Sequence, residues 1–308
     1  MKELKILAVV VFFTLITYIG VEPFAHSQMH EHIEPVDYKY SDLKPLNKKG
    51  DPKKGAETFM NAGCIGCHGV KSQGMAAPMD PVSASASFGV VPPDLSTAGA
   101  LYDETFLANL IKNPAHALML EHKFNESKPH PMTPFMGLGG DLDQEVADIV
   151  AYLKSIAPKK LDDKEAFIDA CGRCHNVKYD KWTVIGEKPK LESEKAKAEF
   201  NLKLATYEEN LKKYLGTTPP DLSIIVRAKS EEHLMNFMGE PQRVLHGTAM
   251  PRVGITKENA EKVIAYLEKV GDRKKDERNS LTLKIIIFFI IFSIFAYLWK
   301  ASKWREVH

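Results

Sequence analysis

The 308-residue sequence is short of net charge and of cysteine. It has 41 basic residues (lysine plus arginine) and 40 acidic ones, a formal net charge of +1, which is not the basic surplus of a nucleic-acid-binding protein. With 44% hydrophobic and 26% charged residues, the composition argues against a disordered chain. The length allows about two domains. The 4 cysteines are few enough that their placement has to be explained.

Two long hydrophobic runs frame the chain. The first, Ile6–Val21, is followed by no small-x-small cleavage site, so residues 1–25 are predicted to be an uncleaved membrane anchor, with a cleaved signal peptide as the alternative. The second, residues 281–299, is interrupted only by Lys284 and predicts a C-terminal transmembrane helix. Basic residues flank the two runs at their outer ends: Lys2, Lys5, Lys300, Lys303 and Arg305. The positive-inside rule therefore predicts a bacterial inner-membrane protein whose middle part lies in the periplasm.

The pentapeptide PPDLS occurs twice, at Pro92–Ser96 and at Pro219–Ser223. Upstream of the first copy stands NAGCIGCHGV (residues 61–70), and upstream of the second stands IDACGRCHNV (residues 168–177). Both upstream stretches contain C-x-x-C-H. Matches that recur in the same order indicate an internal repeat, so the chain consists of two versions of one unit.

The two copies also continue alike. After each PPDLS come an expected helix, a proline, a methionine in a turn and an amphipathic helix, at residues 142–156 in one copy and 256–270 in the other. The repeat predicts a first domain at 51–158 and a second at 159–272, joined to the N-terminal anchor by a linker at 26–50. The expected fold class is all-α, with two tandem domains between two terminal membrane helices.

The four cysteines form two C-x-x-C pairs, each followed directly by a histidine. Two disulfides or one zinc site would be alternatives, but neither explains the two histidines. The C-x-x-C-H signature indicates covalent attachment of haem c. The sequence therefore predicts two covalently bound haems c, one held by Cys64, Cys67 and the proximal ligand His68, the other by Cys171, Cys174 and His175.

A methionine is expected as the sixth ligand of each iron, because it closes the site and raises the reduction potential. Met250 stands in GTAMPRVG, just before the last periplasmic helix. In the first copy Met132 has similar turn-like flanks and is preferred to Met136. His130 and His246 are the rivals, and either would make a bis-histidine haem of lower potential. No catalytic residue is expected.

The order of these features resembles the class I cytochrome c family: C-x-x-C-H near the start, Pro-Asp-Leu in the middle, and a methionine before a closing helix with VAYL or IAYL. In that family a proline carbonyl of the middle loop accepts the N–H of the proximal histidine, which fixes the ring and its tautomer. The resemblance implies this role for Pro92 or Pro93 towards His68, and for Pro219 or Pro220 towards His175, with Pro93 and Pro220 assigned.

The second copy, with PPDLSIIVRAKSEEHLMNF (residues 219–237), MPRV and a single C-terminal membrane helix, resembles cytochrome c1 of the quinol:cytochrome c reductase. The whole layout is similar to the dihaem subunit of some bacterial complexes of this type. The resemblance implies a cytochrome b subunit, a Rieske iron–sulfur protein and membrane lipid as partners, with a cytochrome c or terminal oxidase as acceptor. The subunit would not catalyse a reaction alone. A subunit of a cytochrome c oxidase or periplasmic dehydrogenase, or a dihaem peroxidase, is the alternative.

Two stretches remain. Residues 190–216 are an insertion with an apolar stripe, expected to pack on its own haem domain. The HSQMHEH stretch (residues 26–32) is interpreted as solvated linker and not as a metal site.

The long linker and the short tether after residue 272 together predict that electrons enter at the haem of His175 and Met250 and leave at that of His68 and Met132.

Overall fold

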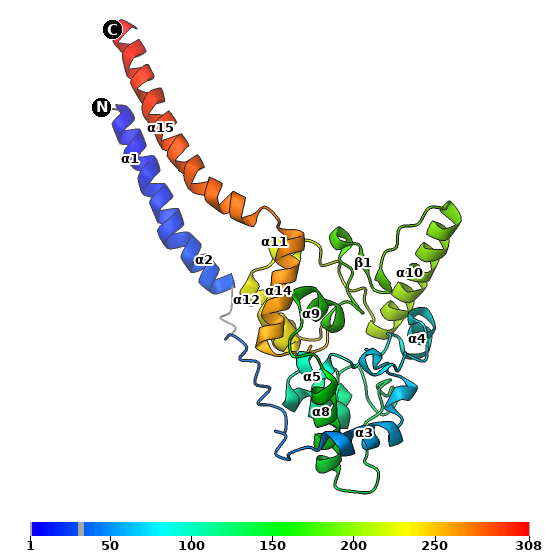
Figure 1. The fold of residues 1–308 in the computed structure, drawn as a ribbon. Helices are drawn as coiled ribbons and strands as arrows, with labels where there is room; N and C mark the ends of the chain where they lie inside the picture. Colours follow the sequence, from blue (N-terminus) through cyan, green and yellow to red (C-terminus); the bar gives the residue numbers. More distant parts are fainter. Residues whose placement is uncertain (1, 30–33, 308) are drawn as a thin grey trace. The chain divides into compact units, whose positions relative to one another are not determined.

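The structure, a computed structural model, describes residues 2–29 and 34–307 (Figure 1). The described part is mainly helical, as expected from the sequence, and its strands are the short antiparallel pair β1 (Trp182–Thr183) and β2 (Gly186–Glu187). Residues 30–32 of the HSQMHEH stretch lie outside the described residues, so the interpretation of that stretch stays a prediction.

The helices between the termini form two similar series. The first contains α3 (Pro52–Asn61), α4 (Pro81–Phe88), α5 (Ala98–Leu101), α6 (Glu104–Lys112), α7 (Pro114–Ala117) and α8 (Leu142–Ile156). The second contains α9 (Asp163–Ala170), α10 (Glu194–Leu215), α11 (Ile225–Ala228), α12 (Glu231–Gly239), α13 (Pro241–Val244) and α14 (Lys257–Gly271). Short 3-10 turns lie within or just after the cysteine motifs: η2 (Cys64–Gly66) within the first, η3 (Lys71–Gln73) after it and η4 (Lys178–Asp180) after the second. A proline starts α7 and α13 at corresponding places, in line with the repeat.

The chain forms two compact units, and each takes segments from both halves of the sequence. Unit 1 consists of Met1–Cys64, Tyr102–Ala157 and Glu232–Lys257. Unit 2 consists of Ile65–Leu101, Pro158–Glu231 and Glu258–His308. Because the units interleave, the tandem domains at 51–158 and 159–272 stay a prediction.

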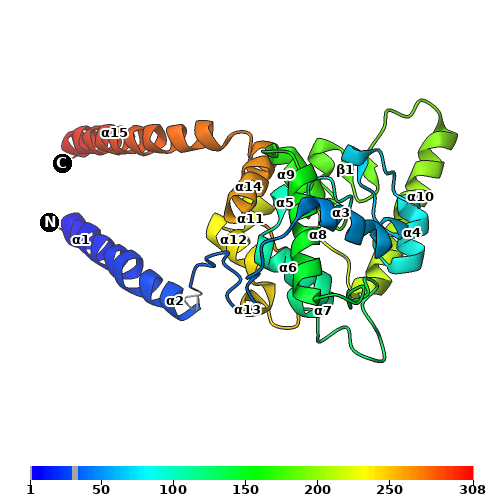
Figure 2. The same cartoon turned by 60° about the horizontal axis from the view of Figure 1, so that its bottom comes forward.

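In unit 1, α3 lies against α8 (Figure 2). A Cβ atom on Gly55 would overlap the main-chain carbonyl of Asp148, so the close approach of these helices requires glycine at this position. Phe59, which is 1% exposed, packs on Tyr152 with 5.4 Å between the ring centroids. The first and last helices of the first series thus form one packed pair.

The described part of the expected linker at residues 26–50 is packed into unit 1 and includes buried side chains. Tyr38 and Tyr40 are each 5% exposed. The Tyr38 hydroxyl donates to the carbonyl oxygen of Met235 at 2.7 Å, and the Tyr40 hydroxyl to that of Ile255 at 2.6 Å. Both tyrosines have positive φ, 58° and 49°, a conformation that costs energy in a bulky residue and is held by such contacts.

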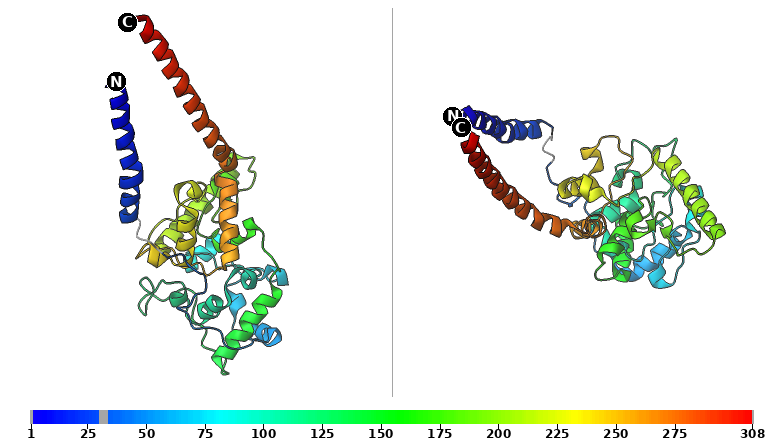
Figure 3. Two further views of the ribbon diagram at one scale, coloured as in Figure 1. Left: turned by 90° about the vertical axis from the view of Figure 1, so that its left-hand side faces the viewer. Right: turned by 90° about the horizontal axis from the view of Figure 1, so that it is seen from above.

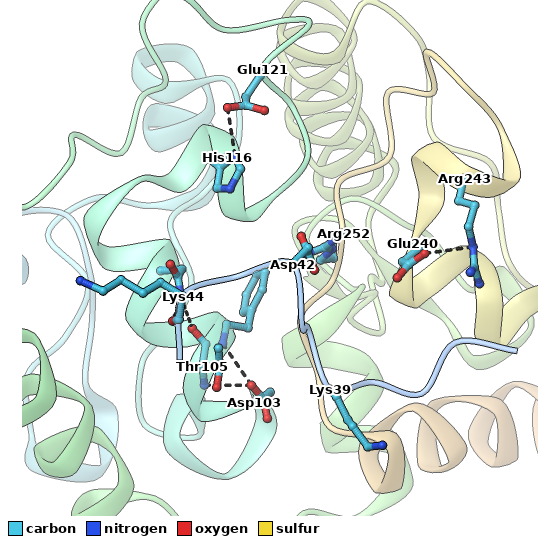
Figure 4. A network of polar contacts seen from close by, with 12 residues as sticks. Lys39, Asp42, Lys44, Asp103, Thr105, His116, Glu121, Glu240, Arg243 and Arg252 are labelled. Atoms are coloured by element: carbon cyan, nitrogen blue, oxygen red, sulfur yellow. Dashed lines mark hydrogen bonds and ion pairs between the residues drawn. The ribbon is translucent and has the colours of Figure 1, made fainter. Parts of the chain in front are cut away.

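An ion pair also holds this segment. Arg252, whose side chain is 1% exposed, pairs with Asp42 at 2.9 Å (Figure 4). Its guanidinium carbon lies 5.5 Å from the ring centroid of Tyr40. The residues after position 33 therefore do not act as a long free tether. The predicted direction of electron flow rested on such a tether and loses that support.

In unit 2, the pairing of first and last helices recurs. Phe167 of α9 packs on Tyr266 of α14 with 4.8 Å between the ring centroids, as Phe59 packs on Tyr152 in unit 1. The Tyr266 hydroxyl also donates to the carboxylate of Asp180 at 2.8 Å. The same aromatic contact at corresponding positions supports a common origin of the two series.

The inserted helix α10 packs against α4, as both views show (Figures 1 and 2). Tyr207 and Leu211 of its apolar stripe are buried, and the side-chain amide of Asn210 donates to the hydroxyl of Ser85 at 3.1 Å. We expected α10 to pack on its own haem domain. In line with this, the side-chain amide of Asn176 in the second series donates to the carboxylate of Glu208 in α10 at 2.9 Å. Since α4 comes from the first series, the insertion also connects the two series within unit 2.

Two terminal helices are long and apolar enough to cross a membrane. At the N-terminus, α1 (Lys2–Leu15), the π-helical η1 (Ile16–Val21) and α2 (Glu22–Met29) follow one another, and the most apolar 18-residue stretch within Glu3–Ala25 has a mean hydropathy of 2.3. At the C-terminus, α15 (Lys275–Val307) follows α14 after a short break (Figure 3), and the most apolar 18-residue stretch within Lys275–Arg305 has a mean hydropathy of 2.5. Both helices are compatible with membrane anchoring.

Candidate functional site

Each histidine of the two C-x-x-C-H motifs is bonded to a proline carbonyl in the PPDLS loop that follows it. The Nδ1 atom of His68 lies 2.9 Å from the carbonyl oxygen of Pro93, and that of His175 lies 2.9 Å from the carbonyl oxygen of Pro220. A carbonyl only accepts, so Nδ1 carries the hydrogen in both rings. Nε2 of each neutral ring then keeps its lone pair, as a metal ligand requires.

The remaining residues of PPDLS repeat the same bonds in both loops. The leucine N–H donates to the carbonyl of the residue after the histidine, the aspartate accepts from a main-chain N–H of the following turn, and the serine hydroxyl accepts from the next N–H. The pairs in the first loop are Leu95–Gly69, Asp94–Lys71 and Ser96–Ser72. The pairs in the second loop are Leu222–Asn176, Asp221–Lys178 and Ser223–Tyr179. The pentapeptide therefore recurs with the same contacts.

A tight turn at the end of a helix presents the second cysteine pair. After α9, the carbonyl oxygen of Cys171 accepts from the N–H groups of Cys174 and His175, at 3.1 and 3.0 Å. Cys67, Cys171 and Cys174 take part in no disulfide. Burial raises the pKa of Cys171 to about 12 and also raises that of Cys174, so these groups are thiols and not reactive thiolates. The arrangement suits bonding to a prosthetic group better than nucleophilic catalysis.

The electrostatics of both histidines favour the neutral ring. Partial burial lowers the pKa of His68, and the nearby Arg173 charge lowers it further against the opposing effect of the bond to Pro93. Burial likewise lowers the pKa of His175 against the effects of Pro220 and Asp221. Neutral rings with free Nε2 lone pairs, each beside a cysteine pair, fit the ligand set of haem c. Among the described residues, no group of three or more His, Cys, Asp or Glu side chains forms another metal site.

The candidate methionine ligands lie in unit 1, whereas both histidines lie in unit 2. Met132 and Met250 are half-buried, while Met136 is 82% exposed. These exposures favour Met132 over Met136 in the first copy. The pairing of each methionine with an iron stays a prediction.

The two histidine rivals differ in their surroundings. His130 packs edge-on against Phe124 and accepts at Nδ1 from the N–H of Met132 at 3.1 Å. His246 is exposed. The His130 ring thus has a structural contact of its own, which weakens its case as a ligand.

Sequence reasoning missed two residues beside these motifs. Arg173 occupies a variable position of the second C-x-x-C-H, and its Nη1 donates to the carbonyl oxygen of Val91 at 3.2 Å. Tyr207 was noticed only as part of an apolar stripe, yet its hydroxyl donates to the carbonyl oxygen of Arg173 at 2.8 Å. An arginine inside a haem-attachment motif and a tyrosine in a buried stripe were the available signals.

Comparison with known proteins supports part of this interpretation. Residues 52–157 match the cytochrome c family, a family whose members carry covalently bound haem c. A search of the curated proteins finds no match. Among solved structures, the chain is similar to one described as "Hyperthermophilic respiratory Complex III", with 23% identity and a TM-score of 0.37 over 47% of this chain and 75% of that one.

Proposed function

We propose that this protein is a dihaem c-type cytochrome subunit of a quinol:cytochrome c oxidoreductase. One observation carries the dihaem part of the proposal: the histidine–proline bond and the other PPDLS contacts occur twice, each time beside a C-x-x-C-H motif. The match of residues 52–157 to cytochrome c supports the first site, and the duplicated geometry extends it to the second.

The chain's own residues would hold and orient the two groups. One haem c would be bonded to Cys64 and Cys67, with His68 and Met132 as ligands. The other would be bonded to Cys171 and Cys174, with His175 and Met250. Haem c held in this way supplies one-electron transfer. The carbonyls of Pro93 and Pro220 keep each imidazole neutral and fixed in orientation, so little reorganisation accompanies a change of charge.

The assignment to a quinol-oxidising complex rests on the cytochrome c1-like stretch at residues 219–237, on MPRV, and on the apolar helix α15. In this assignment the subunit accepts electrons from a Rieske iron–sulfur protein beside a cytochrome b subunit. It passes them to a cytochrome c or a terminal oxidase on the periplasmic side. The subunit itself forms and breaks no bonds, and the complex is the enzyme.

The test is purification of the full chain from its native membrane in mild detergent, followed by identification of what accompanies it. We expect haem b and an iron–sulfur protein to co-purify, and quinol to reduce the haem c of the preparation. Co-purification with a copper-containing oxidase or with a periplasmic dehydrogenase would contradict the assignment. Peroxide turnover by the reduced protein would point to a peroxidase instead.

A further inference from the structure

Arg173 belongs to the second C-x-x-C-H motif but is bonded to the first PPDLS loop. Its Nη1 donates to the carbonyl oxygen of Val91 at 3.2 Å, and Val91 stands two residues before Pro93, the acceptor for His68. All these residues lie in unit 2. One side chain therefore connects the attachment motif of the second site to the proximal loop of the first.

Tyr207 reinforces the same connection. Its hydroxyl donates to the carbonyl oxygen of Arg173 at 2.8 Å and accepts from the N–H of Val91 at 3.2 Å. The side chain is 0% exposed. Both main-chain groups of Val91 are thus bonded to residues of the second series, which fixes the position of the loop.

The rest of the first loop is bonded to the second series as well. The Thr97 hydroxyl donates to the carboxylate of Asp169 in α9. The side-chain amide of Asn259 in α14 donates to the carbonyl oxygens of Ala100 and Leu101 at 2.8 and 3.0 Å. The segment that holds His68 is therefore packed on the helices that hold His175.

The position of Arg173 gives its charge an electrostatic role at both sites. Reduction of an iron lowers the local positive charge by one, so a nearby fixed cation favours the reduced state. Arg173 is between Cys171 and Cys174 in the second motif, and its guanidinium also contacts the first loop at Val91, two residues before the carbonyl that accepts from His68. In a partly buried setting, one unit charge changes such an equilibrium on the order of tenfold.

We propose that Arg173 is a positioning residue shared by the two haem sites, whose charge raises both reduction potentials and whose bond to Val91 couples the second attachment motif to the first proximal loop. This inference rests on the proposed binding of two haems. It adds that the two potentials depend on a single residue. The first motif has Gly66 at the corresponding position, so the arrangement is not duplicated.

The test is spectroscopic redox titration of the full protein carrying Arg173→Gln, which removes the charge and keeps a donor for the Val91 carbonyl. We expect both potentials to fall, each by about a tenfold change in the reduction equilibrium, which is 59 mV for one electron. Arg173→Lys should restore both potentials. Lys188→Gln removes an exposed charge and should leave both unchanged. Tyr207→Phe, which loses the hydroxyl without any charge, separates structural from electrostatic effects and should lower neither potential.

Each outcome is decisive. A fall of both potentials in Arg173→Gln, with rescue by lysine, supports the shared role. A fall of only one, or equal shifts in Tyr207→Phe and Arg173→Gln, overturns it. Haem content of every variant is measured first: a wild-type protein without two haems contradicts the proposed function, whereas two haems with unchanged potentials contradict this inference alone. If Arg173→Gln does not fold, the potentials of Arg173→Lys are measured at a pH at which the lysine is neutral. Potentials equal to those of the wild-type protein at that pH would overturn the inference equally.

Discussion

His175 donates a hydrogen bond from Nδ1 to the carbonyl oxygen of Pro220 at 2.9 Å across 45 residues of chain, and His68 donates the same bond to Pro93 across 25. In both cases the ring is held by main chain and not by a side chain, so the acceptor cannot be lost through substitution. What substitution can change is the position of the loop that carries the carbonyl. The residues that hold the loop are therefore the ones to alter.

Asp94→Ala and Asp221→Ala form a matched pair of variants. Asp94 accepts from the N–H groups of Lys71 and Ser96, and Asp221 from those of Lys178 and Ser223. Loss of these bonds loosens the loop, weakens the bond from histidine to proline and makes the imidazole a poorer donor to iron. We expect each variant to raise the potential of one haem and to lower the free energy of unfolding by about 1 kcal/mol.

Redox titration checks this prediction, with the double variant as a control. Because the two loops make separate bonds, the two shifts should appear on different haems and should add. If both substitutions shifted the reduction potential of the same haem, the two loops would not hold the two histidines independently.

Met250→His should lower one reduction potential markedly and leave the other nearly unchanged, because a second imidazole stabilises ferric iron better than a thioether does. Met132→His should act in the same way on the other haem. Met136→Leu is the matched control, since that side chain is 82% exposed, and it should change neither potential. If the Met136 variant moved a potential and the Met132 variant did not, the ligand in the first copy would be Met136.

The stability of unit 1 should depend on pH because of the Asp143 carboxylate. This carboxylate pairs with Lys44 at 2.9 Å and with Lys112 at 3.0 Å, and these partners lower its pKa to about 2. The folded state thus binds the proton more weakly than the unfolded state does. The stabilisation is present above about pH 4 and is lost as the pH falls towards 2.

Thermal unfolding from pH 7 to pH 2 measures this effect. Asp143→Asn should unfold at a lower temperature than wild type at neutral pH, and the difference should shrink below about pH 4. Glu57→Gln, an exposed change on α3, serves as the control. A difference that stays constant down to pH 2 would show that the ion pairs do not account for the loss.

Local features of the fold were predictable from the sequence. The helix expected at residues 142–156 is α8 with those bounds, and the one expected at 256–270 is α14, shifted by one residue. Their amphipathic pattern and the cap provided by Asp141 are signals carried by neighbouring residues. The motif residues were also identifiable, because C-x-x-C-H and PPDLS are short and repeated.

The long-range contacts were not predictable. Asp42 and Arg252 are 210 residues apart, and nothing near either residue indicates the other. Tyr38 and Tyr40 stand in a stretch rich in charge and proline whose sequence predicts a linker; their burial depends on hydroxyl bonds to distant carbonyls. The bond from Arg173 to Val91 was equally unpredictable, because hydrophobic periodicity indicates which face of a helix is buried but not which residues cover that face.

The most direct test of the central claim is the number of haems c per chain, measured by pyridine haemochrome absorbance and by the mass of the intact polypeptide. The wild-type protein should carry two. Replacing Cys64 and Cys67 together by alanine should leave one, replacing Cys171 and Cys174 should also leave one, and replacing all four should leave none. One haem in the wild type, or two haems retained in either double variant, would contradict the two-site interpretation.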